Sequence, residues 1–377
     1  MTPSQEATRS QPTTRPCPGL SPGTQFHLPE LAQRFSCDYH PDYHAIVRSN
    51  EQWVVQSLYA GDTDRARASL NCLTGLMICT GYPQGDRDRM LDICQLSEWW
   101  FLIDDEFTHI LSDQRIPEQD RPPLARRYLD DMWSLVLGEP ATTSPAWSPD
   151  AVRALFKRIR SRLEPAAFDR MLTAFATWQQ DGLTTEQQTP DISALDLPAY
   201  LQIRRDSTAC TSYATITEYV LDIEIPPQTL NHPLVQEYQR TIMNCWILPS
   251  DLFSFRKECF HGDHTNAVCL LRRTQQLSLQ EAVDTLASHQ AESQEQALDL
   301  YAQIAATPLG TSGDLLTYLA TLQQIEAATQ RWCYMTPRYH GDGFHWNGAL
   351  SGTMTLYPDY TQFPPIHARS PQPTQTP

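Results

Sequence analysis

The chain has 377 residues, of which 41% are hydrophobic and 19% are charged, and its formal net charge is −16. This length allows one large or two smaller globular domains with a buried core. The acidic balance disfavours nucleic acid as a partner and simple electrostatic attachment to anionic membranes, because both interactions need a basic surface.

The chain begins with residues 1–24, whose Pro-, Thr-, Ser- and Gln-rich composition predicts a disordered segment. Apolar residues then recur at three- and four-residue spacing, which predicts helices over 44–59, 65–80, 87–111, 122–138, 150–162, 167–181, 192–223, 232–259, 265–272, 277–306 and 312–334. Period-two alternation is rare, so strands are not expected. The tail 364–377 resembles the first segment. We therefore expect a single all-α domain over 25–363, with long helices around a central pocket.

The ten cysteines are scattered and include no C-x-x-C pair. This pattern favours reduced, buried thiols over disulfides or a zinc site. No stretch approaches the roughly 20 apolar residues of a membrane-spanning helix, and the N-terminus lacks a signal-peptide pattern. We expect a soluble, cytoplasmic protein without a membrane span.

An acidic cluster, Asp104-Asp105-Glu106, follows the apolar run Trp99–Ile103 near the end of the predicted helix 87–111. Most Asp-Asp pairs are solvated surface charge, but the preceding aromatic residues argue against a fully exposed face here. Carboxylate oxygens are the ligands that Mg²⁺ prefers, usually one or two for each ion. The cluster is therefore a candidate half of a magnesium site.

A second polar motif lies in the predicted helix 232–259, where Ser250, Ser254 and Glu258 follow one another at four-residue spacing. This spacing places all three side chains along one stripe of a helix. Two hydroxyls and a carboxylate can hold a hard cation, and the neighbouring Lys257 can pair with a phosphate. Taken alone, the motif is better explained as an ordinary polar helix face with a Glu/Lys surface cluster.

Together the two motifs resemble the metal-binding pair of microbial class I terpene synthases, in which an aspartate-rich motif precedes an (N/D)D-x-x-S-x-x-(K/R)E motif. Ser250 lies 146 residues after Asp104 (250 − 104), as the family spacing requires. The segment around Arg204 resembles the family's pyrophosphate-sensing arginine segment, and Arg338-Tyr339 resembles its C-terminal Arg-Tyr pair. The resemblance covers roughly residues 26–345.

Four positions depart from the family pattern. Thr108 and His109 stand where the aspartate-rich motif usually has a further acid. Ser250 replaces the usual Asn or Asp ligand, and Asp251 is an alternative ligand beside it. Ala209 occupies a position that is usually glycine, near an expected helix break. His261 and His264 follow the second motif, where a loop is favoured over a metal site.

The resemblance implies the class I terpenoid synthase helical bundle and a Mg²⁺-dependent terpene cyclase. Its substrate would be a linear isoprenyl diphosphate, with farnesyl diphosphate favoured over geranylgeranyl diphosphate. The implied reaction ionises the substrate, cyclises the carbocation to a terpene hydrocarbon or alcohol, and releases pyrophosphate. About three Mg²⁺ ions are implied, with Mn²⁺ as a substitute.

The resemblance also implies three groups of site residues. The metal ligands would be Asp104, Asp105, Ser250, Ser254 and Glu258; the diphosphate contacts Arg204, Arg205, Lys257, Arg338 and Tyr339; and the pocket lining Trp100, Phe101, Ala209, Trp246 and Trp332. For each aromatic residue, ordinary core packing remains the alternative.

Two other functions stay open. A non-catalytic homologue that binds an isoprenoid is compatible with the changes at Thr108 and Ser250. A chain-elongating prenyltransferase ranks lower, because that reaction needs two aspartate-rich motifs. A homodimer is compatible with the resemblance, although no sequence feature demonstrates it.

Overall fold

Long helices dominate the computed structural model, which describes residue 17 and residues 19–140, 145–183, 185, 194–260 and 265–358. The expectation of an all-α fold is confirmed. The helices are α1 (Tyr43–Trp53), η1 (Val54–Leu58), α2 (Thr63–Leu70), α3 (Thr74–Gly81), α4 (Arg87–Ser112), η2 (Glu118–Asp120), α5 (Arg121–Leu137), α6 (Pro149–Ser161), α7 (Pro165–Ala176), η3 (Thr177–Gly182), α9 (Leu197–Ser207), α10 (Cys210–Leu221), α11 (Pro227–Leu230), α12 (Pro233–Glu258), α13 (Ala267–Thr274), α14 (Leu279–Ala305), η5 (Pro308–Thr311), α15 (Gly313–Met335) and α16 (Pro337–His340).

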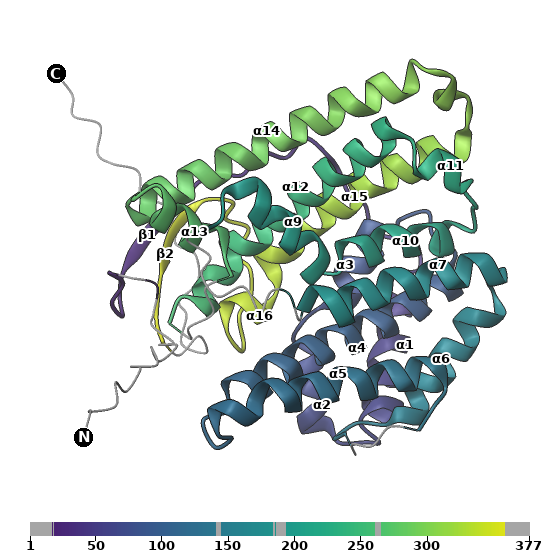
Figure 1. Ribbon diagram of the computed structural model, residues 1–377, viewed down its shortest axis with the longest axis horizontal. Helices are drawn as coiled ribbons and strands as arrows, with labels where there is room; N and C mark the ends of the chain where they lie inside the picture. The colour runs from purple at the N-terminus through teal and green to yellow at the C-terminus, as the bar shows by residue number, and fades with distance from the viewer. Residues whose placement is uncertain are drawn as a thin grey trace, which may run out of the picture.

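Three long helices, α12, α14 and α15, lie side by side along one part of the bundle (Figure 1). Helix α3 packs against α15, and α4 packs against α3 and α5 on the other part. Among the described helices, none combines the length and the hydrophobicity that a membrane crossing requires. All ten cysteines are free thiols, as the sequence predicts.

Two short strands correct the expectation that the chain has none. Strand β1 (Gln25–Leu28) pairs antiparallel with β2 (Gly352–Thr355), and Phe26 stands opposite Met354. Four residues are too few to produce a clear alternating pattern. Because the two partners come from opposite ends of the chain, local sequence does not reveal that they pair.

Two of the predicted helices are interrupted. The predicted helix 65–80 divides into α2 and α3, because Leu73 adopts a left-handed conformation with φ of 54°. The predicted helix 192–223 divides into α9 and α10 at Ala209, the position where the family usually has a glycine at a helix break. The other long helices agree with the predicted ranges to within a few residues, because their apolar periodicity is strong.

The ordered part of the chain begins before residue 25, which corrects the predicted extent of the N-terminal segment. Cys17 is 1% exposed, and its backbone N–H donates to the carbonyl oxygen of Cys259 at 2.9 Å. The Gly23 N–H donates to the Leu356 carbonyl at 2.8 Å. The predicted tail 364–377 lies outside the described residues.

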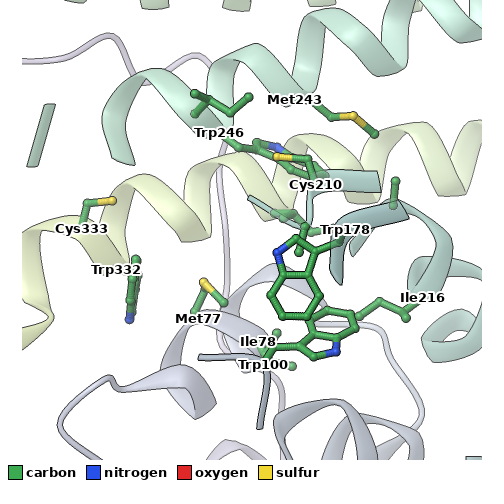
Figure 2. Packing of buried hydrophobic residues seen from close by; sticks show 14 of the residues in the cluster. Met77, Ile78, Trp100, Trp178, Cys210, Ile216, Met243, Trp246, Trp332 and Cys333 are labelled. Carbon is green, nitrogen blue, oxygen red and sulfur yellow. The ribbon is translucent and has the colours of Figure 1, made fainter. Parts of the chain in front are cut away.

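Large apolar side chains fill the interior where α3, α4, η3, α10, α12 and α15 meet (Figure 2). Trp100 lies within 5.8 Å of Trp178 and within 5.0 Å of Tyr213, measured between ring centroids. Trp246 and Met243 approach from α12, and Trp332 from α15 (Figure 2). Aromatic groups of this size contribute much of the apolar area that a core buries.

A buried carboxyl group lies between α14 and α15. Glu326 is 1% exposed, and its Oε1 accepts hydrogen bonds from Gln294 Nε2 at 2.6 Å and Gln290 Nε2 at 3.4 Å. Burial raises the pKa of Glu326 to about 8, although the two amide donors oppose the shift. The folded protein therefore holds this carboxyl in its neutral form at neutral pH.

Replacing Glu326 with glutamine is expected to make the protein less sensitive to alkaline pH. Between the ordinary pKa of 4.5 and the folded pKa of about 8, the folded state keeps a proton that the unfolded state releases, so wild-type stability falls as pH rises through this range. Glutamine cannot ionise. The Tm of the variant should exceed that of the wild type by at least about 3 °C near pH 9, and by less near pH 5.

The control for this measurement is Glu237→Gln, because Glu237 is an exposed residue of α12. Its Tm should follow that of the wild type at both pH values. A Glu326→Gln Tm that also follows the wild type would contradict the proposed neutral carboxyl.

Candidate functional site

The acidic cluster of α4 meets basic side chains from α12 and α16. Arg338 Nη2 lies 3.0 Å from Asp104 Oδ2, and Arg338 Nη1 lies 2.6 Å from Asp105 Oδ2. Lys257 Nζ lies 3.6 Å from the other Asp105 oxygen. Glu106 points to another side, where its Oε2 accepts a hydrogen bond from Trp147 Nε1 at 3.4 Å. The structure thus brings the aspartate pair, Lys257 and Arg338 together, without Glu106.

The opposite charges in this cluster stabilise the ionised forms of Asp105 and Arg338. Burial on its own would raise the pKa of Asp105, but the Arg338 and Lys257 charges hold it below its ordinary value. Burial opposes the charge on Arg338, yet Asp105 and Asp104 hold the Arg338 pKa well above its ordinary value. Asp105 and Arg338 therefore stay charged at neutral pH.

A buried Arg-His contact fixes α16, the short helix that carries Arg338. Arg256 Nη1 donates to His340 Nδ1 at 3.0 Å, and His340 Nε2 donates to the Cys333 carbonyl at 2.8 Å. Burial and the Arg256 charge together lower the pKa of His340 to about 3, so the imidazole is neutral and can accept this bond. Burial also lowers the pKa of Arg256, to about 9. Sequence reasoning missed both residues, because Arg256 stands at a variable position of the second motif and His340 lies outside the motifs.

The stripe predicted on α12 is present, and an asparagine from the next helix contacts two of its members. Asn266 is fully buried, and its Nδ2 donates to Glu258 Oε2 at 2.9 Å and lies 3.4 Å from Ser254 Oγ. The Asn266 Oδ1 also caps α13 by accepting from the Val268 N–H at 2.9 Å. Sequence reasoning missed Asn266; its position before an apolar helix start indicated only a cap.

Asp251 is not placed to substitute for the missing ligand at Ser250. It is fully buried, and its carboxylate accepts hydrogen bonds from Tyr200 Oη, from Arg204 Nη2 at 2.9 Å and from the Ala267 N–H at 3.0 Å. These contacts direct Asp251 into the protein interior and toward Arg204. The Ser250 hydroxyl is partly exposed and lies 3.9 Å from Cys333 Sγ.

The two sequence-predicted arginines of α9 point to different places. Arg204 pairs with Asp251, which belongs to the second motif. Arg205 Nη1 instead donates to Asn244 Oδ1 at 2.8 Å and lines a separate hollow. Adjacent helix residues lie about 100° apart around the axis, and here the two side chains reach different partners, Asp251 for Arg204 and Asn244 for Arg205. The expectation that Arg205 joins Arg204 at the diphosphate is therefore corrected.

The expected break between α9 and α10 is present at Ala209. This residue has φ of 58° and ψ of 19°, a left-handed conformation that glycine adopts with less strain. Trp178 Nε1 donates to the carbonyl of Ser207 just before the break, at 3.0 Å. Trp178 was not among the predicted site residues, and its contact with the break depends on tertiary packing.

Aromatic rings adjoin the charged cluster. The Arg338 guanidinium carbon lies 5.0 Å from the centroid of the Phe101 ring, and Phe101 lies 5.6 Å from Trp332. The Tyr339 ring lies 5.2 Å from Trp332. Trp100 and Trp246 are buried in the apolar interior shown in Figure 2. The predicted aromatic set thus divides into residues beside Arg338 and residues farther inside.

The oxygen-bearing side chains of the two motifs suit a metal ion whose coordination is completed by substrate oxygens. Within the described part of the chain, no three His, Cys, Asp or Glu side chains converge as a ready-made metal site. Asp104 and Asp105 instead come from α4, while Ser250, Ser254 and Glu258 come from α12. Mg²⁺ commonly takes one or two carboxylates and completes its octahedron with water and substrate phosphates. The residues present therefore fit Mg²⁺.

The remaining expectations about this region concern polar residues near the two motifs. Thr108 and His109, which replace the family's further acid, are exposed on the last turns of α4. His261 and His264 lie outside the described residues.

Comparisons with known proteins agree on one family. Residues 95–296 match the sequence model described as terpene synthase family 2, C-terminal metal binding. A (3S,6E)-nerolidol synthase from Selaginella moellendorffii is 24% identical over 347 residues, which cover 90% of this chain and 91% of the relative. A 10-epi-cubebol synthase from Sorangium cellulosum is 24% identical over 260 residues, which cover 69% of this chain and 81% of the relative.

Solved structures share the fold. The germacradien-4-ol synthase from Streptomyces citricolor matches with a TM-score of 0.63 at 19% identity, covering 83% of this chain and 97% of that protein. The SVS_A2 protein, from ancestral sequence reconstruction, matches with a TM-score of 0.69 at 19% identity and covers 85% of this chain and 92% of that protein.

Proposed function

Because this chain belongs to terpene synthase family 2 and is a class I terpene synthase, we propose that it ionises a linear isoprenyl diphosphate with Mg²⁺ and cyclises the resulting carbocation. Farnesyl diphosphate is the favoured substrate, because a sesquiterpene synthase from Cyclocybe aegerita is 23% identical over 87% of this chain. The product is a terpene hydrocarbon or alcohol, released together with pyrophosphate.

One contact carries the proposal: Arg338 bridges Asp104 and Asp105 while its guanidinium lies over the Phe101 ring. This arrangement puts the charged cluster directly against an aromatic surface. A prenyl diphosphate has the matching shape, with a multiply charged head and an apolar chain. The charged side would hold the diphosphate, and the aromatic side would hold the hydrocarbon.

The proposed roles follow from the chemistry of each group. Asp104, Asp105, Ser250, Ser254 and Glu258 would hold Mg²⁺, which when bound neutralises the negative charge that develops on the departing diphosphate. Arg204, Lys257, Arg338 and Tyr339 would donate hydrogen bonds to its oxygens, and the arginines can do so in bidentate fashion.

The apolar interior would protect the carbocation. The rings of Phe101 and Trp332 can stabilise positive charge through their π faces without acting as nucleophiles. Trp100 and Trp246 are at most 5% exposed, so they would help to exclude water, which would otherwise trap the cation. The left-handed turn at Ala209 interrupts the helix beside this interior.

The test is pyrophosphate release from farnesyl and geranylgeranyl diphosphate, with the organic products identified by gas chromatography and mass spectrometry. Release should require Mg²⁺ and stop when EDTA is added, and readdition of Mg²⁺ should restore it. Mn²⁺ is expected to support part of the activity. If the purified protein bound a prenyl diphosphate but released no pyrophosphate from either substrate, the non-catalytic alternative would replace this proposal.

A further inference from the structure

A polar hollow of about 440 Å³ lies apart from the charged cluster, where α7, α9, α10 and α12 meet. These helices pack against one another in one region of the bundle (Figure 1). Its lining includes three arginines, Arg170, Arg205 and Arg240, and it includes none of the residues proposed to bind metal. Three arginines around one hollow are unexpected in a chain whose net charge is −16.

Two of these arginines have no carboxylate bonded to them. Arg205 is partly buried, and the hydrogen-bond partner of its Nη1 is the neutral amide oxygen of Asn244, at 2.8 Å. Arg240 is exposed, and no hydrogen bond or ion pair joins it to another residue in the described part of the chain. Burial lowers the pKa of Arg205, and the nearby Arg240 charge lowers it further. The two cations therefore repel each other across the hollow.

The acidic residues of the hollow do not supply the missing partner. Glu218 Oε1 forms an ion pair with Arg170 Nη2 at 3.4 Å and accepts a hydrogen bond from the Ile225 N–H at 2.9 Å. Asp206 lines the hollow as well, and its charge and that of Arg205 attract each other, but no ion pair or hydrogen bond joins their side chains among the described residues. Arg170 Nε is buried without a hydrogen-bond partner among the described atoms. The partly buried Arg205 is thus bonded to a neutral amide, and the exposed Arg240 lines the same hollow, so two guanidinium groups are available to an anion there.

Neutral hydrogen-bonding groups complete the lining. Gln236 and Gln239 of α12 face the hollow together with Thr211 and Thr215 of α10. Gln236 Nε2 donates to the Leu230 carbonyl at 2.8 Å and Gln239 Nε2 to the Tyr318 hydroxyl at 2.7 Å, so these amides would donate to a ligand oxygen by exchanging those bonds. The lining therefore matches a compact ligand with several charged oxygens, and it matches a hydrocarbon poorly.

We propose that this hollow is a second binding site, separate from the metal-binding cluster, for a small multiply charged oxyanion. Arg205 and Arg240 would bind its charged oxygens, and Arg170 would donate from its unpartnered Nε. A phosphate-type and a polycarboxylate-type anion share this chemistry. Arg205 and Asp206 precede the break at Ala209 and Thr211 follows it, so a bound anion would also brace the junction of α9 and α10.

The test measures anion binding to the full chain by isothermal titration calorimetry at low ionic strength in the presence of EDTA. One arm uses inorganic pyrophosphate and the other uses citrate. The wild type should bind at least one probe, and the comparison shows whether phosphate or carboxylate oxygens are preferred. Arg240→Gln should weaken that binding about tenfold or more, because it removes a charge-assisted donor.

Arg48→Gln is the matched control, because Arg48 is an exposed arginine of α1 far from the hollow's lining. It should bind as the wild type does. Arg240→Gln should keep wild-type turnover with Mg²⁺, which shows that the variant is folded. Unchanged affinity in Arg240→Gln, or no binding of either probe to the wild type, would overturn the proposal. Pyrophosphate can also bind at Arg338 and Lys257, which lie outside the hollow, so the loss in Arg240→Gln assigns the signal to the hollow, and turnover with Mg²⁺ tests the cyclase proposal separately.

Discussion

Asp104→Asn is expected to lower the rate of pyrophosphate release by at least about 100-fold at saturating substrate, as the loss of a charged group that stabilises the transition state commonly does. Asparagine keeps the size of the side chain but removes the negative charge that faces Arg338 at 3.0 Å. A neutral amide holds Mg²⁺ less tightly than a carboxylate. The Mg²⁺ concentration for half-maximal rate should therefore rise together with the loss in kcat.

Thr108→Ala is the control on the same helix. Thr108 is exposed, one turn beyond Asp104, at a position where the family usually has an acid. If only the first aspartates hold metal, removal of the Thr108 hydroxyl leaves both the rate and the Mg²⁺ requirement unchanged. An Asp104→Asn enzyme with wild-type kinetics would show that the metal is bound elsewhere.

Arg338→Ala is expected to lower kcat/KM for the prenyl diphosphate by about 1,000-fold, and Arg338→Lys is expected to restore little of it. Arg338 uses two nitrogens to contact two carboxylates, at 2.6 and 3.0 Å. Lysine presents a single ammonium group and cannot reproduce this planar, two-pronged geometry. The same geometry is what a diphosphate needs from its donor.

Measuring the stability of the Arg338 variants shows whether a fall in kcat/KM comes from lost substrate contacts or from lost folding. The Arg338 side chain is 9% exposed, but its partners Asp104 and Asp105 are 39% and 44% exposed. Water can therefore hydrate the carboxylates once the guanidinium is gone, so the cost should be well below the roughly 3–5 kcal/mol of a fully buried pair. Circular dichroism should show a folded protein with a modestly lower Tm.

Arg331→Ala serves as the control for Arg338. Arg331 is an arginine of α15 that contacts the Tyr39 hydroxyl at 2.9 Å, away from the aspartate pair. Its kcat/KM should stay near the wild-type value. If Arg338→Ala kept the wild-type kcat/KM while remaining folded, Arg338 would have no part in binding the diphosphate.

The long helices were predictable because their apolar periodicity is a local property of the sequence. Helix α4 was expected over 87–111 and spans Arg87–Ser112, and α12 was expected over 232–259 and spans Pro233–Glu258. The four-residue spacing of Ser250, Ser254 and Glu258 likewise determines that they share one face. The break at Ala209 was expected from the family resemblance, since local pattern alone suggested a continuous helix.

Contacts between distant segments were beyond local reasoning. Asn266 contacts Glu258 across a turn, and His340 accepts a hydrogen bond from Arg256, 84 positions away. Strand β1 pairs with β2 from the other end of the chain. No periodicity or motif spacing encodes these pairings, because each depends on how the helices pack.

The sequence by itself determined the all-α fold through its local apolar periodicity, and the resemblance of its two polar motifs to a known family pointed to a terpene synthase. Only the tertiary structure decided which side chains meet. In the folded protein Arg338 forms ion pairs with Asp104 and Asp105, and Asp251 forms an ion pair with Arg204 in the interior. The tertiary structure also placed Arg205 beside Asn244 at a separate hollow, because the packing of α9 against its neighbours decides which groups each of its side chains meets.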